Sequence, residues 1–205
     1  IGVNAGNSIA SGGNYNVVVG DEAGTALTTG DNNTFVGYAS GDATDDGNDN
    51  VAIGHQALSA NAGDDNVAIG KDALLVNIKN QNIAIGSHAL DSDVNGGTSV
   101  AIGHNALQTQ APATATDMYN VAVGNSAGAA VTTGTNNTFV GGLSGDAQTT
   151  ASNNTFLGYA TGSAVNTGRK NTFIGSTAGD AITASDFNVA VGADALTADT
   201  LGSKT

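Results

Sequence analysis

The chain has no cysteine and no tryptophan, and its 205 residues include one proline and one methionine. No disulfide framework is therefore possible, and with only 4% aromatic residues an ordinary globular core of large side chains is not expected. Basic residues are also scarce: 5 Lys and Arg against 18 Asp and Glu argue against a nucleic-acid partner, because phosphate contacts need cations. No apolar run reaches the roughly 18 residues of a membrane span. No signal peptide is recognisable, and since the chain begins in mid-motif we expect a fragment of something longer.

Glycine, by contrast, is abundant, with 30 residues, and it recurs in a motif of Asn, three strand-forming residues and Gly. The motif occupies 16–20, 33–37, 50–54, 66–70, 82–86, 99–103, 120–124, 137–141, 154–158, 171–175 and 188–192. Its glycines lie 16 to 21 residues apart, most often 17. Such a unit is too short for two helices or a propeller blade. We predict one all-β domain over 1–205, a parallel β-solenoid of about 12 turns, or rungs, on the order of 55 Å long.

Two motif positions are expected to shape each rung. The Asn is predicted to form a ladder of side-chain amides along the rod, with Ser99 as its one break. The Gly is predicted to mark a corner where φ is positive or where backbones pack closely, and a larger residue there should strain the turn. The structural residues singled out are the ladder residues Asn33, Asn137, Asn154 and Asn171 and the corner residue Gly37.

The apolar positions of the motif predict the core. The third strand position is always Val, Ile or Leu, and this column is predicted to be buried. The middle position is Ala in rungs that carry Leu four residues after the Gly, and Phe in rungs that carry a second Gly there. The Phe and Gly pairs are Phe35 with Gly41, Phe139 with Gly145, Phe156 with Gly162 and Phe173 with Gly179. We predict that the middle strand position and the position four residues after the Gly fill one shared site in the core. The rungs just before Phe35 and Phe139 have neither Phe nor Leu at these positions, and we predict that these two rings also fill the space there.

These rungs resemble known repeats. NVAIGHQAL, NVAIGKDAL, NIAIGSHAL and SVAIGHNAL resemble the head repeats of trimeric autotransporter adhesins of the YadA type. NNTFVGYASG, NNTFLGYATG and NTFIGSTAGD are similar to related repeats of bacterial surface proteins and phage tail fibres. The resemblance covers nearly the whole chain. It implies a left-handed β-roll, a homotrimer, and an extracellular location on a cell surface or a virion tail fibre, with a role in attachment.

One acidic loop is the best candidate for a cation site. The segment DATDDGNDN at 42–50 is followed one rung later by two further aspartates. Hard oxygen ligands from stacked loops could hold Ca²⁺, although no EF-hand or calcium-roll pattern is present. The candidate ligands are Asp42, Asp45, Asp46, Asp49, Asp64 and Asp65. The alternative is a solvated loop, and no other cofactor is expected.

The remaining polar residues indicate neither a metal site nor catalysis. His55 and His104 share a column but lie three rungs apart, and His88 is one position away, so we interpret all three as exposed turn residues. No nucleophile, base and orienting acid stand in a recognisable motif, and no carboxylate pair is placed by the repeat, so no enzyme is predicted.

Two further features bear on function. Thr138, Thr155 and Thr172 stack on successive rungs, which leaves ice binding as a minor alternative. The longest connection, 107–120, holds the only Pro and the only Met and is a natural recognition point, or else a tolerated insertion. We predict adhesion or contact with a host or matrix receptor or glycan. The main alternative is a structural spacer or self-assembling filament subunit.

Overall fold

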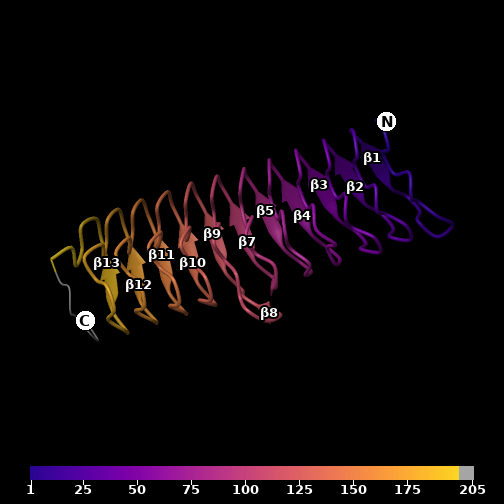
Figure 1. Ribbon diagram of the computed structural model, residues 1–205. Coiled ribbons are helices and arrows are strands. Elements are labelled where there is room, and N and C mark those ends of the chain that lie inside the picture. The colour runs from indigo at the N-terminus through magenta and orange to yellow at the C-terminus, as the bar shows by residue number, and fades with distance from the viewer. Residues whose placement is uncertain (199–205) are drawn as a thin grey trace.

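The computed structural model describes residues 1–198. Eleven parallel strands form one sheet in chain order, and two shorter strands pair beside it. The strands are β1 (Val17–Val19), β2 (Thr34–Val36), β3 (Val51–Ile53), β4 (Val67–Ile69), β5 (Ile83–Ile85), β6 (Gly96–Gly97), β7 (Val100–Ile102), β8 (Thr116–Asp117), β9 (Val121–Val123), β10 (Thr138–Val140), β11 (Thr155–Leu157), β12 (Thr172–Ile174) and β13 (Val189–Val191). The predicted parallel β-solenoid is confirmed, and Figure 1 shows its rungs stacked along a rod. In the described part of the chain no helix is long and apolar enough to cross a membrane.

Pairing between rungs keeps the motif in register. Phe139 lies opposite Ala122 on one side and Phe156 on the other, and every neighbouring pair of long strands repeats this alignment. Equivalent positions therefore stack in continuous columns along the rod. The N-terminal residues also stack, since the carbonyls of Ile1 and Val3 accept hydrogen bonds from the next rung.

The prediction that the third strand column is core was wrong. None of its eleven residues is buried: Val19 is 38% exposed, Leu157 45% and Val191 68%. In a strand of three residues the first and third side chains point to one face and the middle one to the other. The middle column is the one that faces the interior, so the β-branched residues lie on the outside.

The core is built from the middle column and from the position four residues after the corner Gly. Phe35, Phe139, Phe156 and Phe173 are fully buried, as are the Leu residues of the Ala-containing rungs that follow β3, β4, β5 and β7. A Cβ built on Gly41 would lie 2.7 Å from the ring of Phe35. Gly128 belongs to a rung without Phe, and its Cβ would lie 2.7 Å from the ring of Phe139 in the next rung. These distances agree with the predicted shared site.

The Asn ladder is present, although its amides do not hydrogen-bond mainly to one another. Asn154 accepts a hydrogen bond at Oδ1 from the backbone N–H of Asn171 (2.8 Å) and donates one from Nδ2 to the carbonyl of Gly168 (2.8 Å). Most ladder residues repeat this pattern, and those from Asn33 to Asn188 are buried. Each amide therefore satisfies two backbone groups inside the rod, where an unpaired group would be costly.

The corner glycines meet both predicted conditions. Gly54 has a φ of 140°, and a Cβ on it would lie 2.5 Å from the carbonyl oxygen of Gly70 in the next rung. Most side chains are excluded from such a corner by the backbone conformation and by the stacked rung together.

Candidate functional site

The outer strand face is a strip of apolar side chains along the rod. We define it as the first and third positions of the eleven long strands. These are Val17, Val19, Thr34, Val36, Val51, Ile53, Val67, Ile69, Ile83, Ile85, Val100, Ile102, Val121, Val123, Thr138, Val140, Thr155, Leu157, Thr172, Ile174, Val189 and Val191. None of these residues is charged and none is buried, although the chain has a net charge of −13. Because large exposed apolar surfaces are typical of interaction sites, this strip is a candidate surface for association.

The three stacked threonines lie on this same face. Thr138, Thr155 and Thr172 are paired directly in β10, β11 and β12. Val121 and Val189 continue their column on either side. The threonine patch is thus short and enclosed by apolar residues, and ice binding stays a prediction.

The acidic loop uses several of its carboxylates to join rungs. Asp42 accepts a hydrogen bond from Ser59 (2.5 Å), and Asp45 accepts one from Thr28. Asp64 accepts two from Asn48, at 2.8 and 3.1 Å. Asp46, Asp49 and Asp65 are exposed. Within residues 1–198 no three acidic, His or Cys side chains converge as a metal site would require, and calcium binding stays a prediction.

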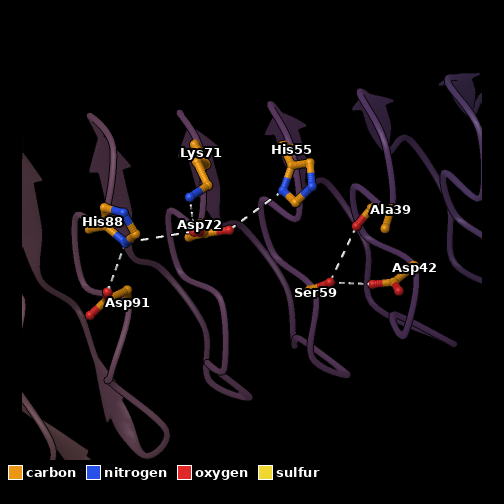
Figure 2. A network of polar contacts seen from close by, with 8 residues as sticks. All are labelled: Ala39, Asp42, His55, Ser59, Lys71, Asp72, His88 and Asp91. Atoms are coloured by element: carbon orange, nitrogen blue, oxygen red, sulfur yellow. Dashed lines mark hydrogen bonds and ion pairs between the residues drawn. The ribbon is translucent and has the colours of Figure 1, made fainter.

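A second polar cluster gathers two of the histidines around a nearly buried carboxylate (Figure 2). Asp72 is 8% exposed and lies 3.2 Å from Nζ of Lys71. Nδ1 of His55 and Nδ1 of His88 each lie 3.7 Å from its oxygens, and His88 also contacts Asp91 at 3.1 Å. All three histidines lie in turns, and His55 and His104 are exposed as predicted, whereas His88 is partly buried. The repeat also brings His55 and His88 to one carboxylate. Their rungs flank the rung of Asp72, so the columns bring them together.

The histidines of this cluster have carboxylates as their main polar partners. In the part of the chain that the structure describes, the histidine nitrogens contact carboxylates and one amide, and none contacts a hydroxyl group. Lys71 supplies a cationic group beside Asp72. The arrangement can therefore neutralise a buried carboxylate between rungs.

The long connection forms a projecting arm with the rung before it. We define the arm as β6, β8 and residues 111–115. Gly96 pairs with Thr116 and Gly97 with Asp117, and the N–H of Met118 donates to the carbonyl of Gly97 at 3.0 Å. Figure 1 shows β8 projecting beyond the neighbouring rungs. The predicted recognition loop is thus an ordered, paired extension of two rungs.

Beneath the arm lies a buried polar column that the sequence reasoning missed. Asn77, Asp93 and Gln110 each stand eleven residues after a ladder residue, on three successive rungs, and all three are fully buried. Gln110 donates to Asp93 (2.6 Å) and to Ser99 (3.1 Å), and accepts from Asn120 (2.8 Å). Gln110 therefore spans the ladder break at Ser99. Elsewhere the same column contains the apolar residues Leu27, Val131, Val165 and Ile182 and the polar residues Thr44, Asn61 and Gln148.

The buried carboxyl of Asp93 is expected to make the stability of this region depend on pH. Burial raises the pKa of its carboxyl from 3.8 to about 6, although hydrogen bonds from Gln110 and Gly96 act to lower it. A carboxyl whose pKa is raised by folding favours the folded state only while it is protonated. We therefore expect the free energy of unfolding to fall by up to about 3 kcal/mol as pH rises from about 4 to above 6.

Thermal melting of wild type and Asp93→Asn between pH 4 and 7.5 measures this effect. As pH rises, the melting temperature of Asp93→Asn should increase relative to that of wild type. Asp46→Asn, at an exposed position, should keep a constant difference from wild type over the whole pH range. Because the other acidic residues are the same in the variant and in wild type, their mutual repulsion affects both melting temperatures alike and drops out of the difference. A constant difference between wild type and Asp93→Asn would contradict the prediction.

Comparison with protein-family models, with curated proteins and with solved structures finds no match to this chain.

Proposed function

We propose that this chain is a non-enzymatic fibre or head segment at a bacterial or phage surface, which associates with copies of itself and contacts a receptor. The observation that carries the proposal is the outer strand face, where 22 uncharged side chains remain unburied on a rod with a net charge of −13. The resemblance to adhesin head repeats and tail-fibre repeats supports an extracellular location and three copies.

The dimensions of the face suit such an association. Eleven strands at the usual spacing give a strip about 50 Å long. Stable interfaces bury roughly 800 Å² per partner, and a strip of this length reaches that area once the neighbouring columns join it. A thin solenoid with an alanine-rich interior buries little apolar surface by itself, so covering this face would add to its stability.

Light scattering after size-exclusion chromatography tests the association. Wild type is expected to form a discrete particle of about 60 kDa, three times the 19.9 kDa chain. The double variant Ile69→Lys with Ile85→Lys places two charges in the middle of the face, on neighbouring strands. We expect it to be monomeric, because a buried unpaired charge opposes assembly strongly.

Circular dichroism shows whether the double variant remains folded, as both positions are only partly buried. Ala184→Lys, at an exposed position off the strands, is the matched control and should keep the wild-type mass. A monomeric wild type at tens of micromolar would overturn the proposed association. So would a folded double variant that keeps the wild-type mass, whereas an open polymer would favour the filament subunit.

A further inference from the structure

A cavity of about 520 Å³ lies beside the projecting arm. It is lined from three successive rungs, by residues 78–81, by Asn95 and Gly97, and by residues 115–117. The motif glycines are 16 residues apart in the first of these rungs, from Gly70 to Gly86, and 21 apart in the third. The short rung and the extended arm therefore form a step, and the cavity occupies it.

The lining is mostly polar and carries both charges. Asn80, Gln81, Asn95 and Thr116 offer amide and hydroxyl groups, and Lys79 and Asp117 supply one cation and one anion. Ile78 and Ala115 are the apolar side chains. The volume lies within the range of small-molecule sites, about 300 to 1,000 Å³, and the lining is more polar than in most such sites, which favours a hydrophilic ligand.

Several of these groups have no partner within residues 1–198. The side chains of Lys79, Asn80 and Gln81 make no hydrogen bond or ion pair with any described residue. Loop side chains elsewhere join neighbouring rungs, as Thr149 does with Asn166 and Thr177 with Asp194. Donors and acceptors in the cavity thus remain available to a bound molecule.

Glycines shape the cavity, and a tyrosine stands beside it. A Cβ on Gly97 would lie 3.1 Å from Oδ1 of Asp117, and one on Gly63 would overlap Oδ1 of Asn80. Both glycines therefore leave room for the polar side chains. Tyr119 is 55% exposed, and its hydroxyl donates to Oδ2 of Asp117 (3.4 Å), which places it next to the lining.

We propose that this cavity binds a neutral oligosaccharide. Sugar hydroxyl groups both donate and accept hydrogen bonds, and the amides of Asn80 and Gln81 and the carboxylate of Asp117 match that need. The ring of Tyr119 offers an apolar surface with a polar tip, which suits the face of a sugar ring. The inference rests on the proposed function, for which it names the class of receptor.

The charges and the lining disfavour polyanionic and apolar ligands. A polyanion such as a nucleotide would meet one lysine, the carboxylate of Asp117 and the field of a chain with a net charge of −13. An apolar ligand would leave the amides unpaired, which is costly in a closed contact. A neutral polar ligand satisfies the donors and acceptors without either cost.

A glycan array carrying neutral and sialylated oligosaccharides, probed with the labelled chain, tests the inference, and calorimetry with the best neutral glycan gives its affinity. Asn80→Ala and Tyr119→Asn should each weaken that affinity at least about tenfold, the effect of roughly 1.4 kcal/mol. Tyr119 has a φ of 51°, which asparagine tolerates, so the backbone is retained. The matched control is Tyr15→Asn, in the same column near the other end of the rod, 86% exposed and with a φ of 58°.

The control should bind the neutral glycan as wild type does. Binding of no saccharide, of sialylated glycans alone or of peptides instead would overturn the inference. Neutral-glycan binding that survives both Asn80→Ala and Tyr119→Asn would overturn the assignment to this cavity. Assembly is measured separately by light scattering, so a rod that forms trimers but binds no saccharide contradicts the inference and leaves the proposed association intact.

Discussion

Phe156→Ala is expected to lower the free energy of unfolding by about 3 to 5 kcal/mol, the usual cost of emptying a buried phenylalanine site. Phe156 is fully buried in the middle of a row of rings. Its ring stacks on Phe173 with centroids 5.0 Å apart and lies 5.7 Å from Phe139. Because the interior is narrow and each rung contacts only its neighbours, few side chains can move to fill the cavity. Chemical denaturation followed by circular dichroism measures the change.

Adding Gly162→Leu to Phe156→Ala should restore part of this loss. A Cβ on Gly162 would lie 2.5 Å from the Phe156 ring, so the ring occupies the space of that side chain. Leu74 shows the alternative, since it is buried at the equivalent position with a φ of 50°. A leucine in this left-handed conformation costs about 1 to 2 kcal/mol. The free energy gained by burying the leucine side chain is larger than this cost. We therefore expect a partial recovery of about 1 kcal/mol.

Gly162→Leu alone is the control for the shared site. With Phe156 in place the leucine would overlap the ring, so this variant should be destabilised. The two substitutions are then each harmful alone and less harmful together. A double variant no more stable than Phe156→Ala would show that the two positions do not share one site.

The repeat predicted the architecture because each rung carries its own signals. A glycine spacing near 17, a strand of three residues and one buried Asn leave few alternatives to a stacked parallel sheet. The same pattern could not tell which face is inside. Both faces are apolar, with Ile69 and Ile85 outside and Ala68 and Ala84 inside, so hydrophobicity alone favoured the larger residues as core. The small cross-section of the rung decides it, since the interior holds either a Phe at the middle strand position or an Ala there with a Leu from the following turn.

The candidate sites were harder to predict because they arise between rungs. His55 and His88 lie two rungs apart, and the group that joins them is Asp72 on the rung between them. The cavity depends on the difference in length between neighbouring rungs, which a single repeat does not contain. The sequence contains one signal of the buried polar column. Asp93 and Gln110 each lie eleven residues after a ladder residue, a position that is apolar in several other rungs. Alignment of the rungs by their ladder Asn would have shown this polar column.

Asn154→Ala is expected to lower the free energy of unfolding by about 2 to 6 kcal/mol, although it removes only one small polar side chain. Its amide accepts from the N–H of Asn171 and donates to the carbonyl of Gly168, each at 2.8 Å, and Asn154 is fully buried. The alanine would leave both backbone groups without a partner, and each such buried group costs about 1 to 3 kcal/mol. Chemical denaturation again measures the loss.

Asn166→Ala separates the effect of burial from the loss of a bond between rungs. Oδ1 of Asn166 accepts a hydrogen bond from Thr149 at 2.5 Å, but Asn166 is exposed, so water can replace the amide. This control should change stability by less than about 0.5 kcal/mol. If Asn154→Ala were equally mild, the ladder would be an incidental feature of the repeat. A large difference between the two would instead show that the buried amides hold one rung to the next, since they pair backbone groups that water cannot reach.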